Sequence, residues 1–197
     1  LVSQSFYKGK LKHGRTGTVV KIEDAPICLD RPICWVPTDD IGRQAEQSPV
    51  GTSLVNKSEA EIIANLMRLW GDSDEFLTAL KDTGYEYPIG IICMYAEQKN
   101  LVRASLAKTD VNAKLRRMVK IDTVDSYQGK ENPIVVLSLV RNNQFGPTEH
   151  GQPTIRQGFM SRDNRVNVAF SRAMDKLVIV GAKSNWPAQG PLGRVRS

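Results

Sequence analysis

Two short stretches of this sequence concentrate residue types that bind phosphate groups. The first runs from Ile121 to Asn132 (IDTVDSYQGKEN) and offers hydroxyls, carboxylates and a turn that contains Gly129. The amide N–H groups of such a turn can hold an anion, hydroxyls can bond phosphate oxygens, and a carboxylate can accept from a ribose hydroxyl. An ordinary solvated turn would use the same residues to cap the next element, so the spacing leaves both interpretations open.

The second stretch, Ser161 to Ala173 (SRDNRVNVAFSRA), carries Arg165 and Arg172. On a helix, two residues at this spacing share one face, while Val166 and Phe170 point toward a core. Two guanidinium groups on one face suit a polyphosphate, because arginine keeps its charge and its planar fork matches phosphate oxygens. A solvated basic helix face would show the same pattern.

Segments of strand length are expected to form a sheet beneath these stretches. They lie at 33–36, 89–95, 119–124, 134–140 and 177–180. The second and fourth are almost continuously apolar, which is typical of parallel strands buried on both faces.

Amphipathic helices are expected between the strands. The first begins at Ser58, which has capping-box spacing to Glu61. Its buried face is predicted to hold Ile62, Leu66, Leu69 and Trp70. A second helix follows Tyr95, and a third covers 163–174. The alternation of strands and helices predicts an α/β doubly wound domain with a mostly parallel sheet covered by helices on both faces.

The carboxyl ends of the strands are where such sheets bind ligands. The turns after Tyr95, Val124 and Val140 are therefore the candidate sites, and the Gly-, Pro- and Gln-rich loop over 142–158 is long enough to be functional.

The chain is expected to divide into three parts. These are an irregular lead-in over 1–50 that holds one short strand and packs on the domain, the domain itself over 51–183, and a coil tail over 184–197.

Composition limits the class of protein. The 197 residues, 41% hydrophobic and 24% charged, fit one soluble domain of ordinary size and exclude disordered and fibrous proteins. The net charge of +6 permits a phosphate-bearing partner. Cys28, Cys34 and Cys93 make neither a disulfide framework nor a common zinc motif, so buried, reduced thiols in a cytoplasmic or nuclear protein are expected.

The start of the chain carries no signal or transit sequence, and no apolar run approaches the roughly 20 residues of a membrane span. Because the first residue is Leu1 rather than Met, we expect a piece of a longer chain.

Three blocks, in order, resemble motifs IV, V and VI of superfamily 1 helicases of the up-frameshift and DNA2-like type. They are 91–98 (IICMYAEQ), 123–131 (TVDSYQGKE) and 165–173 (RVNVAFSRA), and the segments at 6–11 (FYKGKL) and 51–60 (GTSLVNKSEA) are similar to two further stretches of that family. The resemblance implies a three-layer RecA-like domain of the P-loop NTPase type. It also implies the second of two motor lobes, with ATP bound between the lobes and single-stranded DNA or RNA lying across both.

The resemblance implies roles for particular residues. Arg172 matches the arginine finger that reaches the γ-phosphate, and Arg165 its companion. Gln128, Gly129 and Glu131 match positions near the γ-phosphate and the ribose. The positions that match nucleic-acid contacts or motif IV are Asn56, Tyr95, Gln98, Thr123, Val124, Asp125 and Ser126.

The sequence also departs from the family. The Walker A loop, the Asp-Glu pair and the water-positioning Gln are absent, and the block at 162–165 reads RDNR where a double arginine is usual. The Mg²⁺ ligands are therefore expected in an upstream lobe of the same parent chain, and the isolated chain is expected not to hydrolyse ATP.

Two functional hypotheses follow. The first is the second motor lobe of an ATP-dependent helicase or translocase, which supplies an arginine finger and part of the single-strand track. The alternative is a RecA-like module without catalysis that serves as a scaffold for nucleic acid or protein. A dinucleotide-binding domain is disfavoured because no G-x-G-x-x-G follows a strand.

Overall fold

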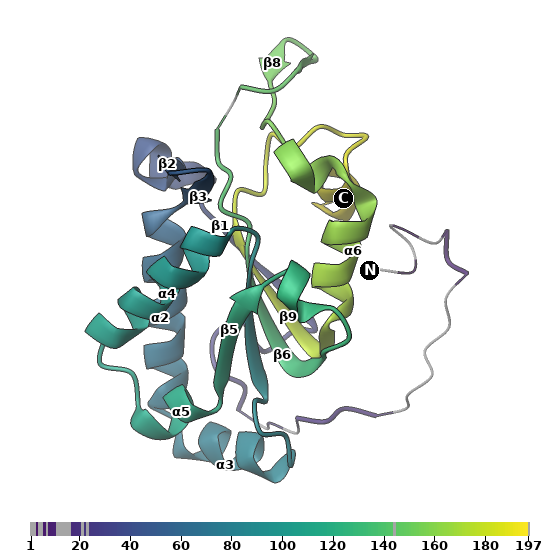
Figure 1. The fold of residues 1–197 in the computed structure, drawn as a ribbon. Coiled ribbons are helices and arrows are strands. Elements are labelled where there is room, and N and C mark those ends of the chain that lie inside the picture. The colour runs from purple at the N-terminus through teal and green to yellow at the C-terminus, as the bar shows by residue number, and fades with distance from the viewer. Residues whose placement is uncertain are drawn as a thin grey trace.

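The centre of the molecule is a five-stranded sheet (Figure 1). The structure is a computed structural model, and it describes residues 3, 6, 8–10, 17–20, 22, 24–143 and 145–196. The strand order is β1-β9-β6-β4-β5, and every neighbouring pair is parallel. The strands are β1 (Ile33–Pro37), β4 (Ile89–Cys93), β5 (Val119–Thr123), β6 (Asn132–Ser138) and β9 (Ala173–Gly181). The predicted parallel sheet is confirmed.

Helices cover both faces of this sheet (Figure 1). Alternate residues of β6 show why: Ile134 and Val136 join one buried cluster, and Val135 and Leu137 join the other. The first cluster packs under α2 (Lys57–Gly71), α3 (Asp74–Asp82), α4 (Ala96–Lys108) and α5 (Ala113–Arg117). The second packs under α6 (Asp163–Ser171) and α7 (Pro191–Arg196). These three layers confirm the predicted RecA-like α/β architecture.

Short elements connect the layers. They are the 3₁₀ turns η1 (Asp39–Ala45), η2 (Asp125–Tyr127) and η3 (Gly158–Ser161), and the two hairpins β2 (Ser48–Val50) with β3 (Ser53–Val55) and β7 (Thr148–Glu149) with β8 (Gln152–Pro153). The β7–β8 hairpin stands above the sheet within the loop predicted over 142–158 (Figure 1).

The start of α2 differs from the prediction. Its N-cap is Asn56, whose side chain accepts a hydrogen bond from the Glu59 amide at 3.1 Å. The predicted Ser58 cap is therefore wrong by two residues. The predicted face is also wrong in part, because Leu69 is 41% exposed, while the buried residues are Glu59, Ala60, Ile63, Ala64, Leu66, Met67, Trp70 and Gly71.

The sequence patterns missed helices α3, α5 and α7 and displaced one boundary. Helix α3 was not predicted because only Phe76, Leu77 and Leu80 of its nine residues are buried. The predicted coil tail is wrong over Pro191–Arg196, which forms α7 with Leu192 fully buried. Helix α6 ends at Ser171, and β9 then begins four residues earlier than predicted.

The lead-in contributes to the sheet. The strand predicted at 33–36 is confirmed as β1, an edge strand that pairs with β9. The amides of Val19 and Val20 donate to Asp175 Oδ2 at 2.6 and 2.9 Å. Phe6 lies 6.4 Å from Phe170, centroid to centroid. Tyr7 and Leu11 of the predicted FYKGKL stretch lie outside the described residues, and the division at residue 50 stays a prediction.

The other edge strand, β5, is covered by a charged side chain. Arg103 of α4 donates from Nη2 to the Ile121 carbonyl at 2.9 Å. All three cysteines are free thiols, but only Cys93 is buried, so the expectation of buried thiols is wrong for Cys28 and Cys34.

Gly90, in the middle of β4, cannot carry a side chain without displacing its neighbours. A Cβ there would lie 2.5 Å from Asn132 Oδ1 and 2.6 Å from the Tyr127 hydroxyl. We expect Gly90→Ala to lower the free energy of unfolding by about 1–3 kcal/mol, the usual cost of overpacking. Urea unfolding followed by circular dichroism measures this, and a change below about 0.5 kcal/mol would contradict it.

Candidate functional site

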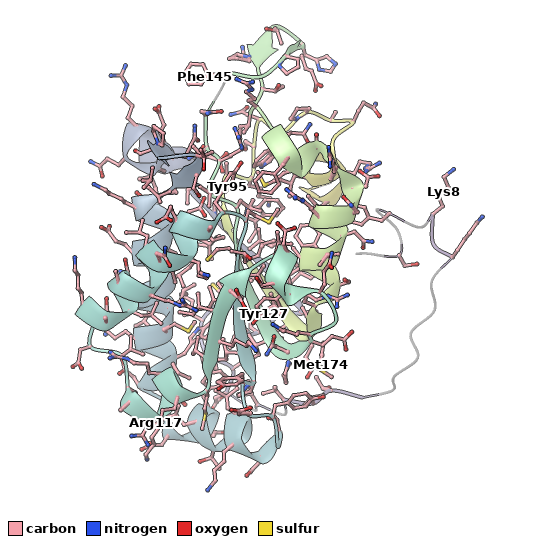
Figure 2. The ribbon with its side chains drawn as sticks, in the orientation of Figure 1. Lys8, Tyr95, Arg117, Tyr127, Phe145 and Met174 are labelled. Atoms are coloured by element: carbon pink, nitrogen blue, oxygen red, sulfur yellow. The ribbon has the colours of Figure 1, made fainter. Side chains whose placement is uncertain are left out.

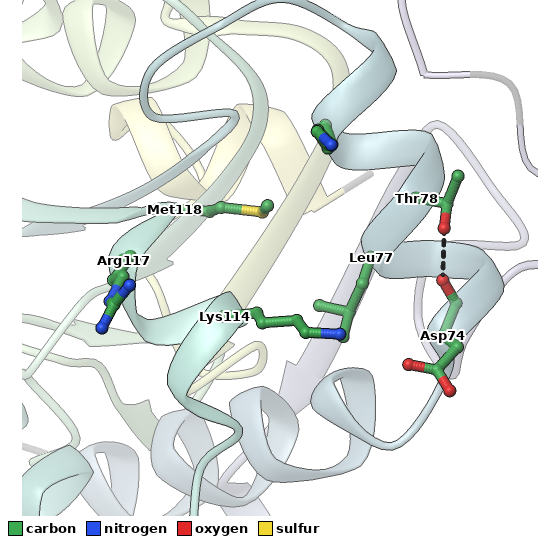
Figure 3. A pocket seen from close by; sticks show the side chains of 7 residues that line it. Asp74, Leu77, Thr78, Lys114, Arg117 and Met118 are labelled. Atoms are coloured by element: carbon green, nitrogen blue, oxygen red, sulfur yellow. Dashed lines mark hydrogen bonds between the residues drawn. The ribbon is translucent and has the colours of Figure 1, made fainter.

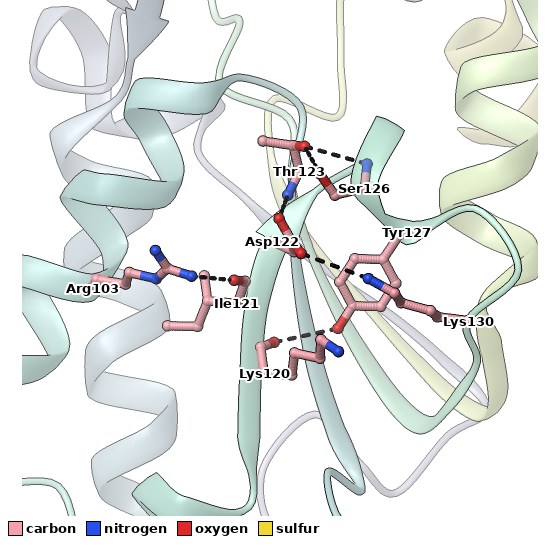
Figure 4. Close-up of polar contacts among 8 residues, drawn as sticks. All are labelled: Arg103, Lys120, Ile121, Asp122, Thr123, Ser126, Tyr127 and Lys130. Carbon is pink, nitrogen blue, oxygen red and sulfur yellow. Dashed lines mark hydrogen bonds and ion pairs between the residues drawn. The ribbon is translucent and has the colours of Figure 1, made fainter.

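The turn after β5 is pre-organised by its own hydroxyls (Figure 4). Thr123 Oγ1 donates to Ser126 Oγ at 3.1 Å and accepts from the Ser126 amide at 3.4 Å. The Val124 amide donates to the Cys93 carbonyl at 3.1 Å, which ties the turn to β4. Asp125 and Ser126 are exposed, whereas the Val124 side chain is buried, so Val124 can meet a ligand only through its backbone.

The connection from β5 to β6 continues through the second predicted group. Gln128, Gly129 and Glu131 are all exposed, and Gly129 has a φ of 76° with no atom within 4 Å of the position of a Cβ. Lys130 Nζ lies 3.9 Å from Asp122 Oδ2, which holds this segment beside β5 (Figure 4). The connection is thus an exposed, open backbone segment of the kind that lets a phosphate group approach closely.

The two predicted arginines contact the same connection at its two ends. Arg172, which follows α6, donates from Nη1 to the Lys130 carbonyl at 3.3 Å. Its Nε and Nη2 also donate to groups of α6, namely the Val168 carbonyl at 3.2 Å and Ser171 Oγ at 2.9 Å. Arg165, near the start of α6, lies 3.4 Å from Asp125 Oδ1 through its Nε. Both guanidinium groups are half-buried, so their charges face this connection with less screening than free surface groups have.

Two residues beside Arg165 were not predicted. The ring of Phe159 lies 4.6 Å from the Arg165 guanidinium and 4.6 Å from the Tyr95 ring, measured to the ring centroids. Arg141 donates from Nε to the Tyr95 hydroxyl at 2.5 Å. Burial raises the pKa of Tyr95, although the charge of Arg141 acts in the opposite direction. Phe159 and Arg141 belong to none of the motifs named above, although Arg141 directly follows Val140, whose turn is one of the candidate sites.

Asn56 and Gln98 occupy the interior rather than the surface. Both side chains have 0% exposure. The backbone amide of Asn56 donates to Gln98 Oε1 at 2.8 Å, and Gln98 Nε2 donates to the backbone carbonyl of Asn56 at 3.0 Å. These bonds fasten the start of α2 to α4. The two side chains have no surface for a nucleic acid in this structure, so they position the edge of the sheet instead of contacting a ligand.

A buried carboxyl group lies next to this pair. Glu59 accepts from Ser138 Oγ at 2.6 Å and from the Val140 amide at 2.9 Å. Burial raises the pKa of Glu59 from 4.5 to about 8, although these hydrogen bonds act to lower it. Val140 has a φ of 72°, which is unusual for a β-branched residue, and its carbonyl accepts from Asn56 Nδ2 at 3.0 Å. In the sequence, Glu59 stands out only as part of the segment at 51–60 that is similar to the helicase family.

The rest of the described chain offers no metal site but has a surface hollow away from the predicted residues. No group of three or more His, Cys, Asp or Glu residues among the described residues could hold a metal ion. No described helix has the length and apolar character needed to cross a membrane. A surface hollow of about 400 Å³ lies between α3 and α5 (Figure 3), lined by Asp74, Leu77, Thr78, Lys81, Lys114, Arg117 and Met118. It contains none of the predicted site residues, and Figure 2 shows Arg117 at the opposite end of the molecule from Tyr95.

Comparisons with known proteins agree on one family. The AAA domain family matches residues 1–184. The mouse DNA replication ATP-dependent helicase/nuclease DNA2 is 30% identical over 165 residues, which cover 83% of this chain and 13% of that protein. A regulator of nonsense transcripts 1 homolog from Drosophila melanogaster is 32% identical over 190 residues, or 91% of this chain and 14% of that protein.

A third relative matches the chain from end to end. The mouse 5'-3' DNA helicase ZGRF1 is 30% identical over 200 aligned residues, which cover 99% of this chain and 9% of that protein. The chain therefore spans only a small part, 9 to 14%, of the length of these three relatives.

Proposed function

This chain belongs to the AAA domain family and is a superfamily 1 helicase domain of the up-frameshift and DNA2-like type, and from that premise we propose that it is the second motor lobe of a nucleic-acid-dependent ATPase. In this role it works with an upstream lobe of the same longer protein, inside the cell. The upstream lobe holds Mg²⁺ and activates water. The present chain supplies an arginine finger and part of a track for single-stranded DNA or RNA.

The observation that carries this proposal is the continuity of the β5–β6 connection. Its first residues, Thr123 to Ser126, present hydroxyls and a carboxylate at the carboxyl end of β5. Its last residues, Gln128 to Glu131, lie beside the Arg172 guanidinium. One short segment thus joins a surface suited to a sugar-phosphate chain with a surface suited to a nucleotide. Movement at one end of such a segment is transmitted to the other.

The residues fit the phosphate end of a nucleotide. Gly129 leaves open space where a side chain would stand, and the positive charge of Arg172 faces that segment. The bound nucleotide supplies the phosphoryl group and, with Mg²⁺, the charge around it. Arg165, bound to Asp125, adds a second cation at the other end of the connection.

In this structure the Arg172 guanidinium donates hydrogen bonds to neutral acceptors. Its donors bond two neutral carbonyls and a hydroxyl. Charge-assisted hydrogen bonds to phosphate oxygens are stronger than bonds to neutral acceptors. When the lobes close, Arg172 therefore leaves the Lys130 carbonyl and stabilises negative charge at the phosphoryl group that is being transferred.

The strand track is proposed to use Thr123, Asp125, Ser126 and the backbone of Val124. Contacts of this type are directed at sugar and phosphate and carry no base information. The choice between DNA and RNA is therefore not encoded in these side chains.

The test is ATP hydrolysis by the full-length gene product, measured with and without single-stranded DNA and single-stranded RNA, next to the 197-residue chain alone. We expect the full-length protein to hydrolyse ATP and to be stimulated by at least one of the two strands, while the chain alone is inactive. A full-length protein that binds a strand without stimulated hydrolysis would instead support the scaffold hypothesis. Hydrolysis by the chain alone would contradict the assignment of Mg²⁺ and water activation to an upstream lobe.

A further inference from the structure

We propose that Arg141, Tyr95 and Phe159 are positioning residues that hold the Arg165 guanidinium against Asp125. With Arg165 they form a row in which cationic and aromatic groups are in contact, here called the stacked row. The inference rests on the proposed function, because it assigns the stacked row to the site of the motor lobe. It adds Arg141 and Phe159, which lie outside the quoted motifs, and gives Tyr95 a positioning role in place of the ligand contact or motif IV role that the family resemblance implies.

The inner end of the stacked row fixes Arg165 from two directions. The guanidinium carbon lies 4.6 Å from the centroid of the Phe159 ring, and Nε lies 3.4 Å from Asp125 Oδ1. The ring limits the tilt of the guanidinium plane, and the carboxylate limits its rotation. A long, flexible side chain is thereby held in one orientation at the β5–β6 connection.

Phe159 is in turn held by Tyr95. The two rings have centroids 4.6 Å apart and an interplanar angle of 60°, a tilted arrangement that aromatic pairs favour. Phe159 lies in η3, just before α6, whereas Tyr95 lies at the N-cap of α4. The contact therefore joins the two helix layers across the carboxyl end of the sheet.

Arg141 fixes both the Tyr95 ring and the loop that carries Phe159. Its Nε donates to the Tyr95 hydroxyl at 2.5 Å, and its Nη1 donates to the Arg156 carbonyl at 3.0 Å. A Cβ on Gly158 would lie 2.5 Å from Arg141 Nη2, and Gly158 has a φ of 55°. The positive φ favours glycine there, and a Cβ at this position would displace the Arg141 guanidinium from its present place.

The direction of Arg141 is set from the core. Val140, the preceding residue, is kept at a positive φ because Glu59 accepts from its amide and Asn56 donates to its carbonyl. Backbone strain of this kind persists only where surrounding contacts enforce it, and it is concentrated at functional sites. Here the strained residue turns the chain so that Arg141 meets Tyr95.

The stacked row therefore connects Val140, which the buried Glu59 holds, to the Arg165 guanidinium at the site. If Phe159 acts through Arg165, then removing both must cost no more activity than removing Arg165 alone. If Phe159 only stabilises the fold, the two losses must add.

A double-mutant cycle in the full-length protein separates these cases. We expect Phe159→Leu and Arg165→Ala each to lower the kcat for strand-stimulated ATP hydrolysis by about tenfold, with the KM for ATP changed less than about twofold, and the double variant to match Arg165→Ala. Phe145→Leu is the matched control, since this loop phenylalanine is 77% exposed and lies outside the stacked row. A double variant that is a further tenfold slower, or a Phe145→Leu variant as slow as Phe159→Leu, would overturn the inference.

A second measurement does not depend on hydrolysis. In the 197-residue chain, the side-chain NMR signals of Arg165 should be shifted upfield by the Phe159 ring, and Phe159→Leu should remove that shift. Tyr95→Phe, which deletes only the hydroxyl that binds Arg141, should reduce it. If the Arg165 signals do not move when Phe159 is replaced by leucine, the positioning role is refuted, whatever the hydrolysis activity of the variant. If the wild-type chain shows the upfield shift of Arg165 but the full-length wild-type protein shows no strand-stimulated hydrolysis, the proposed function is refuted and the positioning role is not.

Discussion

Replacing Arg172 by alanine is expected to lower the kcat of strand-stimulated ATP hydrolysis in the full-length protein by about 10³-fold or more, while the KM for ATP changes by less than about tenfold. The physical reason is that, under the proposed function, Arg172 exchanges neutral acceptors for phosphate oxygens only when the lobes close. Its loss therefore removes stabilisation from the transition state rather than from nucleotide binding. Steady-state kinetics at saturating strand concentration measure both constants.

Two further variants make this result specific. Arg172→Lys keeps the charge but loses the planar fork that bonds Lys130 and Ser171 at once, so we expect little rescue. Arg68→Ala removes an arginine from a surface ion pair with Asp72 on α2 and should leave kcat within about twofold. A kcat for Arg172→Ala near that of the wild type would show that Arg172 is a structural helix-end residue and not an arginine finger.

Replacing Glu59 by alanine is expected to lower the free energy of unfolding of the chain by about 3 kcal/mol or more. The substitution leaves the Ser138 hydroxyl and the strained Val140 amide without their buried acceptor. Glu59→Gln keeps one acceptor oxygen and should cost roughly half as much. Urea unfolding of the three proteins at pH 6 measures the difference.

Glu59 should also make stability depend on pH. Its pKa is raised from 4.5 to about 8 in the folded chain, so the folded state binds the proton more tightly than the unfolded state. The resulting stabilisation is fully present below pH 4.5 and is lost as the pH rises to about 8. The stability of the wild type relative to Glu59→Gln should therefore fall between pH 5 and pH 8.

The control for both experiments is Glu61→Ala. Glu61 is exposed on the same helix and was the predicted partner of a Ser58 cap. Because the cap is Asn56, we expect a change of no more than about 0.5 kcal/mol. A loss for Glu61→Ala as large as that for Glu59→Ala would contradict both the observed cap and the role of Glu59.

The fold could be predicted because its signals are local. Residues 89–93 and 134–137 are apolar without interruption, and this pattern identifies strands that are buried on both faces. Helix α3 escaped prediction because it is short: Phe76, Leu77 and Leu80 have helical spacing, but nine residues do not span the window over which a helical period is recognised. The cap of α2 was misplaced because Asn56 and Ser58 both fit the capping pattern, and only packing against α4 distinguishes them.

The site was harder to predict than the fold. Motif similarity gave Arg165, Arg172 and the β5–β6 connection, and the structure brings these together. It also gave Asn56 and Gln98, but the sequence could not show that both side chains are buried and that the Gln98 side chain bonds the backbone of Asn56. Arg141 and Phe159 reach Arg165 only through the folding of distant segments. No one-dimensional spacing encodes such contacts.

The pairing of β1 with β9 has a consequence for synthesis. Residues 33 and 177 lie side by side in the sheet, so β1, the first strand of the described residues, cannot pair until β9, the last of those strands, has been made. Contacts of such high sequence separation form slowly, because a long loop must close first. During that interval the central strands expose apolar surface, which is the state in which nascent chains need chaperones. Assembly of the sheet, rather than of any single helix, is therefore the step at which production of this domain is most vulnerable.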